Sequence, residues 1–140
     1  MAINDDAEIR ELLASPRRIA VVGASPNPRR ASNEVLAFLI RQGHDVIAVN
    51  PGHAGSTIHG APVVATLANV EPPAEIVDIF RNSEAAAEIV DEALALPVKP
   101  KVIWMQLGVV DEAAASRARA AGVRVVMNRC PAIEIPRLGL

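Results

Sequence analysis

The turn that follows the first apolar run of the chain collects groups that suit a phosphate. Its sequence is Gly23-Ala24-Ser25-Pro26-Asn27-Pro28-Arg29-Arg30, with Ser32 two residues further on. Backbone N–H groups near residues 23–25, the Ser25 hydroxyl and a helix start at Ser32 supply donors and partial positive charge. Arg29 and Arg30 add guanidinium groups that can form paired hydrogen bonds to phosphate oxygens. These residue types predict a phosphorylated small molecule as ligand.

Four more apolar runs end in a similar polar or glycine-containing step. The five steps are Val21-Val22-Gly23-Ala24-Ser25, Ala48-Val49-Asn50-Pro51, Asp78-Ile79-Phe80-Arg81, Trp104-Met105-Gln106-Leu107-Gly108 and Val126-Met127-Asn128-Arg129-Cys130. If the runs are parallel strands, the steps line up along one edge of a sheet, where open α/β folds bind ligands. We therefore expect Asn50, Arg81 and Gln106 to lie near the phosphate turn.

Alternating strands and helices must position these steps. Strands are predicted over 18–23, 46–50, 76–80, 101–106 and 123–127, and helices after caps at Asp5, Ser32, Ser83 and Asp111. The stretch 51–62 is predicted as an irregular crossover with one helical turn near 65–67, and the tail 129–140 as ordered coil. This order predicts one three-layer, Rossmann-like α/β domain over residues 1–140, with a five-stranded parallel sheet in the order 3-2-1-4-5.

Composition narrows the class of ligand. The hydrophobic fraction is 51% but aromatic residues make up only 2%, so the core is aliphatic and little surface is left for stacking bases. The net charge of -2 gives no general attraction for polyanions or anionic membranes. We therefore expect neither nucleic acid nor a membrane as partner.

Cysteine and leader patterns indicate the compartment. The start of the chain has no basic region followed by an apolar run, and no stretch of about 18 consecutive apolar residues occurs. The single cysteine, Cys130, cannot form an internal disulfide. We expect a soluble, cytoplasmic protein. The spacing of His53 and His59 matches no metal signature, so no metal is expected.

Two common phosphate-binding motifs are missing. A dinucleotide-binding turn carries Gly-x-Gly-x-x-Gly, and its second strand ends in an acidic residue. This turn has a single glycine, and the second strand ends in Asn50. A nicotinamide or flavin dinucleotide is therefore a poor fit. The Walker spacing is also absent, which leaves no sequence argument for nucleotide hydrolysis.

The five steps together resemble the small CoA-binding proteins, whose single Rossmann-like domain is similar to the N-terminal domain of the succinyl-CoA synthetase α subunit. The resemblance rests on residues 21–28, 49–51, 77–81, 104–108 and 128–131. It implies coenzyme A at the carboxyl edge of the sheet, with Gly23, Ala24, Ser25 and Arg30 near phosphates, and Asn50, Pro51, Phe80 and Arg81 near the nucleotide end. Gln106 and Gly108, in the fourth matching segment, complete the predicted contacts together with Arg29 and Ser32.

The resemblance implies binding but no reaction. The related synthetase phosphorylates a histidine in a second domain, and none of His44, His53 and His59 stands in a matching context. A complete acyl-CoA synthetase is therefore not expected, and no residue is predicted to be catalytic.

Three hypotheses follow. The first is a non-catalytic module that binds or senses CoA or acyl-CoA. The second is a thiol or thioester enzyme that uses Cys130, which has only Arg129 as a basic sequence neighbour. The third is an atypical NAD-binding, redox-sensing domain. Asp78 and Glu134 are predicted to be structural. Self-association through alanine-rich helices and a partner protein that supplies a catalytic domain both stay open.

Overall fold

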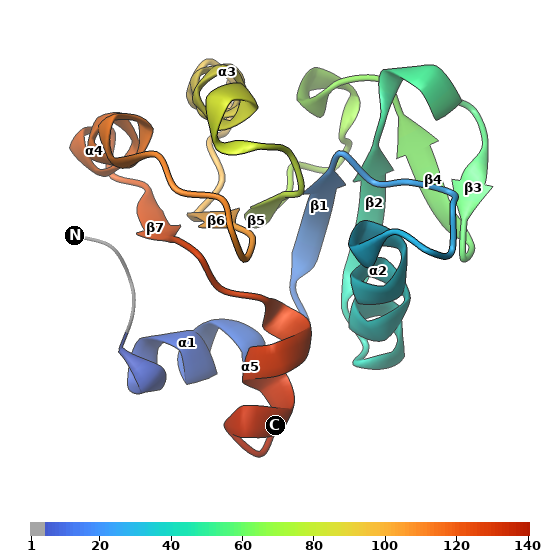
Figure 1. Ribbon diagram of the computed structural model, residues 1–140. Helices are drawn as coiled ribbons and strands as arrows, with labels where there is room; N and C mark the ends of the chain where they lie inside the picture. Colours follow the sequence, from blue (N-terminus) through green and yellow to red (C-terminus); the bar gives the residue numbers. More distant parts are fainter. Residues whose placement is uncertain (1–4) are drawn as a thin grey trace.

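A seven-stranded sheet forms the middle of three layers in the computed structural model, which describes residues 5–140 (Figure 1). The strands are β1 (Arg18–Val22), β2 (Asp45–Val49), β3 (Thr57–Ile58), β4 (Ala61–Val64), β5 (Ile76–Ile79), β6 (Val102–Met105) and β7 (Arg124–Val126). The helices are α1 (Asp6–Leu13), α2 (Ala31–Arg41), α3 (Ser83–Leu94), α4 (Glu112–Ala120) and α5 (Pro131–Arg137), with single 3-10 turns at Pro51–His53 and Leu67–Asn69. Residues 1–4 of the predicted domain lie outside the described residues.

The expected fold class is confirmed, but the predicted sheet was wrong in strand number and order. The order is β3-β4-β2-β1-β5-β6-β7, and every neighbouring pair is parallel except β3 and β4. The third predicted strand, now β5, lies beside β1, whereas it was expected beyond β2. The place beyond β2 is taken by β4, in a stretch that was expected to be mostly irregular.

The missed strand explains the wrong order. Only two residues of β4 pair with β2, and Pro62 interrupts the apolar pattern there. The strands β3 and β4 form a hairpin whose turn residues, His59 and Gly60, have φ angles of 50° and 85°. Positive φ at both positions is what a two-residue hairpin turn of type I′ requires. Without the antiparallel β3, the sheet order is β4-β2-β1-β5-β6-β7. If these six parallel strands are numbered from 1 to 6 along the chain, the order is 3-2-1-4-5-6, which is that of a doubly wound fold.

Helices cover both faces of the sheet (Figure 1). One aliphatic cluster joins α1, α2 and α5 to the face that carries Val21 and Trp104. A second cluster joins α3 and α4 to the face that carries Val77 and Ile79. The expected three layers are therefore present, and the continuous apolar runs of the central strands reflect burial on both sides.

Two of the four predicted helix caps are confirmed. Asp5 accepts a hydrogen bond from the Ala7 N–H at 2.7 Å, and Asp111 accepts one from the Ala114 N–H at 3.0 Å. The other two predictions were wrong. The helix α2 begins two residues earlier than predicted, after Arg30, and Asn82 caps α3 in place of Ser83.

The tail is a helix, which corrects the prediction of ordered coil. Pro131 occupies the first position of α5, where no N–H is needed, and Pro136 lies near the end of the helix, where it removes a single backbone bond. The two prolines therefore delimit a short helix and do not prevent it.

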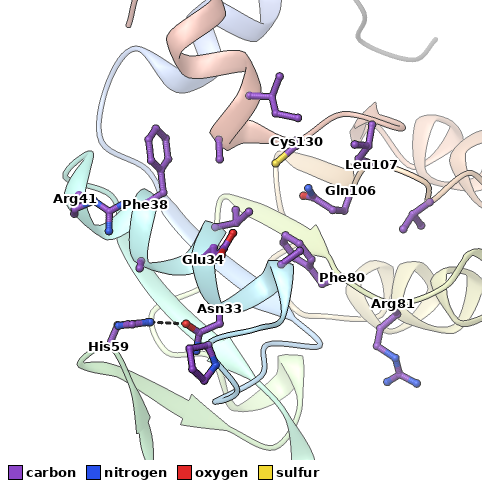
Figure 2. A pocket seen from close by; sticks show the side chains of 17 residues that line it. Asn33, Glu34, Phe38, Arg41, His59, Phe80, Arg81, Gln106, Leu107 and Cys130 are labelled. Atoms are coloured by element: carbon purple, nitrogen blue, oxygen red, sulfur yellow. Dashed lines mark hydrogen bonds between the residues drawn. The ribbon is translucent and has the colours of Figure 1, made fainter.

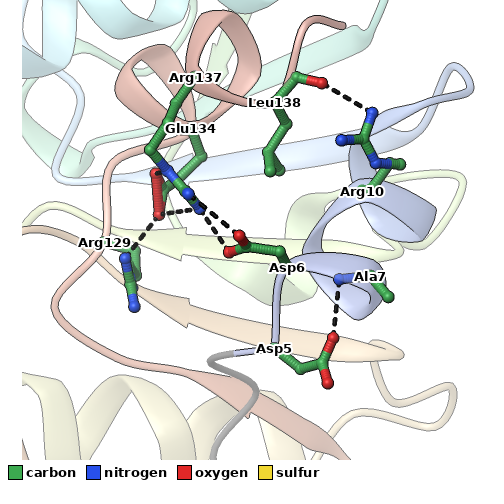
Figure 3. A network of polar contacts seen from close by, with 8 residues as sticks. All are labelled: Asp5, Asp6, Ala7, Arg10, Arg129, Glu134, Arg137 and Leu138. Carbon is green, nitrogen blue, oxygen red and sulfur yellow. Dashed lines mark hydrogen bonds and ion pairs between the residues drawn. The ribbon is translucent and has the colours of Figure 1, made fainter.

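Ion pairs fasten this tail to the first helix (Figure 3). Glu134 is buried and accepts hydrogen bonds from Arg129 at 2.9 Å and from Arg137 at 2.7 Å. Arg137 also reaches Asp6 at 2.7 Å, and its hydrogen bonds lower the pKa of that carboxyl. These contacts give Glu134 the structural role that was predicted for it.

Candidate functional site

The ends of β1 and β5 approach each other at Gly23. This residue has a φ of +87°, and a Cβ added there would lie 2.6 Å from the Phe80 carbonyl oxygen. No side chain fits such a space, and an L-residue rarely adopts that backbone conformation. Glycine at this position therefore lets the first turn sit directly against the end of β5.

Several donors of the predicted phosphate turn are used inside the protein. The Gly23 N–H donates to the Val49 carbonyl at 3.0 Å, and the Ser25 N–H donates to Ser32 Oγ at 3.1 Å. Ser32 is buried and holds the turn, so it acts as an acceptor for the loop and does not cap α2.

Other donors remain free at the same place. Among residues 5–140, the backbone N–H groups of Ala24, Ala31 and Ser32 have no acceptor in the protein. Two of them belong to the first turn of α2, an eleven-residue helix, where the N–H groups and the helix dipole favour an anion.

A cavity of about 400 Å³, the central cavity, opens over this helix start. It is lined by Gly23, Ser25, Arg30, Ala31, Ser32 and Phe80. Six arginines elsewhere are paired with acids: Arg17, Arg18, Arg117, Arg119, Arg129 and Arg137. In the part of the chain that the structure describes, the exposed Arg29, Arg30 and Arg81 have no such partner. Three arginines without an acidic partner therefore lie at the carboxyl edge, although Glu88 and Glu92 line a neighbouring cavity together with Arg81.

A second cavity of about 400 Å³, the β2 cavity, lies on the other side of Gly23. Its lining includes Asn50, Pro51, Leu67, Arg81 and Ile89. The Asn50 side chain is bonded at both ends of its amide, because its Nδ2 donates to the Ala24 carbonyl at 2.7 Å and its Oδ1 accepts from the Gly52 N–H at 2.9 Å. The amide thus fixes two loops around the cavity.

A larger cavity of about 910 Å³, the long groove, runs between α2 and the start of α5 (Figure 2). Phe38 and Phe80 supply aromatic surface, and Gln106 and Cys130 lie where β6 and β7 end. Gln106 is only 6% exposed, and its Oε1 has no hydrogen-bond donor. The groove is therefore largely apolar, and Gln106 Oε1 is a buried acceptor without a partner in its lining.

Asn33 and His59 join this groove to the phosphate turn. His59 Nε2 lies 2.7 Å from Asn33 Oδ1, and Asn33 Nδ2 donates to the Ser25 carbonyl at 3.0 Å. Both residues line the groove, as does Phe38, and none of the three was predicted as a contact. The usable sequence signal was Phe38, a rare aromatic residue beside the aliphatic stripe of α2.

The cavities bring most of the predicted contacts together. The residues that line at least one cavity are Gly23, Ser25, Arg30, Ser32, Asn50, Pro51, Phe80, Arg81 and Gln106. Ala24, Arg29 and Gly108 line none of the three. The Gly108 N–H donates instead to Asn128 Oδ1 at 2.7 Å, which ties the loop after β6 to the loop after β7.

Asp78 lies beneath the site but does not reach it. It is fully buried in β5 between Val21 and Trp104, and neither carboxyl oxygen has a hydrogen-bond partner. Burial raises the pKa of Asp78 well above its ordinary value, so the protonated form is favoured. Asp78 lines none of the three cavities, in agreement with the predicted structural role.

Two other kinds of site were sought in the structure. Among residues 5–140, no three His, Cys, Asp or Glu side chains are grouped so that they could hold a metal ion. Over the same range, none of the helices combines the length and the apolar character that crossing a membrane requires.

A doubly wound sheet, with free backbone donors at its carboxyl edge and a largely apolar groove beside them, defines a Rossmann-like α/β domain with a candidate ligand site. Residues 17–136 match the family described as CoA binding domain, so the chain belongs to that family. It is also 36% identical, over 124 residues and 89% of each chain, to the uncharacterized protein YneT of Bacillus subtilis (strain 168).

Solved structures share this architecture over nearly the full length. A hypothetical protein from Pyrococcus horikoshii OT3 superimposes with a TM-score of 0.90 at 33% identity, covering 100% of this chain and 97% of that one. The structure of cell-free ID.343 from Thermus thermophilus gives 0.89 at 35% identity, covering 96% and 98%. The resemblance drawn from the five strand-end steps is therefore confirmed.

Proposed function

We propose that this chain binds coenzyme A or acyl-CoA along the carboxyl edge of its sheet, as a binding or sensing module that catalyses no reaction. The observation that carries this proposal is the order of the three cavities. Gly23 lines both the β2 cavity and the central cavity, while Ala31 and Phe80 line both the central cavity and the long groove. The cavities thus form one path from a loop-lined pocket, past an anion site, to an apolar groove.

This order matches the parts of coenzyme A. The adenosine end would lie in the β2 cavity, and the pyrophosphate would meet Arg30 and the free N–H groups at the start of α2. The pantetheine arm would run along the long groove against Phe38 and Phe80. Arg81 lines both the β2 cavity and the long groove and would supply positive charge near the phosphates.

The side chains around the long groove support binding without catalysis. Its ionisable lining residues are Glu34, Arg41, His59, Arg81 and Cys130. Among the described residues, the one hydrogen bond of the His59 side chain goes to Asn33, so the groove holds no nucleophile bonded to a general base. Incubation with acetyl-CoA should therefore release no free CoA thiol, and steady release would contradict the non-catalytic assignment.

The dinucleotide alternative has less support. An NAD site needs an acidic residue at the end of β2 to bind the ribose hydroxyls. That position holds Asn50, whose amide is already committed to the two loops.

Isothermal titration tests the proposal. We expect CoA to bind with micromolar affinity, and Arg30→Ala to weaken binding by about 10- to 100-fold, because a hydrogen bond to a charged group contributes about 1.5–3 kcal/mol. Arg124→Ala is the matched control, since this exposed arginine begins β7 at the opposite edge of the sheet. Dephospho-CoA and NAD should bind more weakly than CoA. Binding of NAD without binding of CoA would overturn the proposal.

A further inference from the structure

Cys130 and Gln106 both line the long groove and follow the neighbouring strands β7 and β6. The Arg129 N–H donates to the Met105 carbonyl at 3.4 Å, and Trp104 Nε1 donates to the Arg129 carbonyl at 2.8 Å. These bonds hold the chain before Cys130 against the end of β6, and in the view of Figure 2 the sulfur is drawn near the Gln106 amide.

The Gln106 side chain indicates a ligand at this end of the groove. Its buried Oε1 lacks a donor, and a buried acceptor without a hydrogen bond is unfavourable. A ligand that brings an N–H group into the groove would remove this cost. A pantetheine arm carries two amide N–H groups and ends in a thiol, so it fits both the acceptor and the shape of the groove.

The thiol of Cys130 is reached from the same space. Cys130 is 7% exposed and lines the groove, and it is the single cysteine of the chain. The guanidinium of Arg129 is turned to Glu134, so the sulfur has no charged neighbour from its own loop. Its position indicates that a reagent must enter the groove before it can react.

We propose that Cys130 captures the ligand thiol as a mixed disulfide. This inference rests on the proposed function, because it needs a pantetheine thiol in the long groove. The co-reactant is the disulfide of the ligand itself. The Cys130 thiolate attacks one sulfur of CoA disulfide, the ligand S–S bond breaks, and a bond forms between Sγ and the bound CoA sulfur. The second CoA leaves as a thiolate and takes up the proton that Cys130 released, so one disulfide is exchanged for another.

Binding makes this exchange selective. A ligand anchored at the central cavity raises the local concentration of its disulfide at Cys130, as in any tethered reaction. A small disulfide without phosphates, such as oxidised glutathione, has no anchor and must reach a nearly buried thiol unaided.

Intact-mass spectrometry after addition of CoA disulfide tests the inference. We expect one adduct with the mass of CoA less two hydrogens, formed at least about tenfold faster than the glutathione adduct at equal concentration. Arg30→Ala should slow the CoA adduct and leave the glutathione adduct unchanged. Gln106→Leu should slow the CoA adduct by up to about tenfold, the effect of one lost hydrogen bond, whereas Gln42→Leu, an exposed control, should not.

A parallel titration separates the two proposals. Cys130→Ser should give no adduct but should bind reduced CoA with the affinity of the wild-type protein under reducing conditions. If Cys130→Ser binds CoA while the wild-type protein forms no adduct, or forms it no faster than with glutathione, the capture inference is overturned and the proposed function stands. If neither protein binds CoA, the proposed function fails and the inference fails with it.

Discussion

The two faces of the sheet differ in what they bury. The cluster under α3 and α4 consists entirely of Ala, Val, Ile, Leu and Met side chains. Every buried polar or charged residue that the structure describes belongs to the side of α1, α2 and α5: Ser32, Asn33, His44, Asp78, Gln106 and Glu134. The central cavity and the long groove lie on this second side. The comparison indicates that one face is packed by aliphatic side chains alone, while the other also buries polar groups, of which Ser32, Asn33 and Gln106 line the cavities.

The largest effect on stability should come from the packing face. Ile79 is fully buried in the cluster under α3 and α4, and Ile79→Ala should lower the free energy of unfolding by about 2–5 kcal/mol through lost burial and the cavity left behind. Affinity for CoA should not change, since Ile79 lines none of the three cavities. Urea denaturation and titration measure the two effects, with the exposed Val98→Ala as control. A loss of binding free energy equal to the loss of unfolding free energy would contradict the view that the face under α3 and α4 serves packing alone.

An effect of comparable size is expected at the end of β1, where Gly23 lies between the two faces. Gly23→Ala combines an unfavourable φ with a clash against the Phe80 carbonyl, whereas Gly122→Ala has a similar φ of +85° and open space around it. We expect about 1–2 kcal/mol of destabilisation for Gly122→Ala from backbone strain and about 1–3 kcal/mol more for Gly23→Ala from crowding. Thermal or urea unfolding measures both. Equal losses would show that the approach of β1 to β5 is not constrained by this contact.

The polar face should show an effect that depends on pH. The raised pKa of Asp78 means that the folded state keeps a proton that the unfolded chain releases above about pH 3.8. This group therefore stabilises the fold most fully below that pH, and its contribution falls by up to about 1.4 kcal/mol per pH unit as the pH rises toward the folded pKa.

Asp78→Asn keeps the shape of the side chain and removes the titration. The variant should gain stability relative to the wild-type protein as the pH rises from 4 to 8, as measured by urea unfolding at several pH values. Glu8→Gln, at an exposed position without an ion pair among the described residues, is the control for a general change of charge. A pH-independent difference between Asp78→Asn and the wild-type protein would show that the buried carboxyl does not carry a proton.

Local patterns predicted the parallel strands where the apolar run was long enough. The runs that became β1, β2, β5, β6 and β7 were each placed within about a residue, because burial on both faces leaves a continuous apolar signature. The strand β4 left no such signature, since it needs only Val63 and Val64 to pair with β2. One missed strand was enough to misplace β5 in the sheet.

The residues that line the cavities were likewise predictable only in part. Gly23, Phe80 and Gln106 could be predicted because a strand end fixes where a residue lies in a parallel sheet. Asn33 and His59 could not, because a helix and a hairpin bring them to the groove by packing. The sequence also does not show which donors are already used. Only the fold reveals that the Asn50 amide and the Gly23 N–H are bonded inside the protein.

The sheet ends in two very short strands, and this limits how the protein can meet other chains. The outer strands are β3, with two residues, and β7, with three. A long, flat edge strand offers a row of unpaired backbone groups to which a foreign strand can add, and short edges are one way in which proteins avoid such aggregation. Recognition of a partner protein by strand addition is therefore disfavoured at both ends. Assembly with other chains would have to use side chains on the helices and loops, where it can be selective.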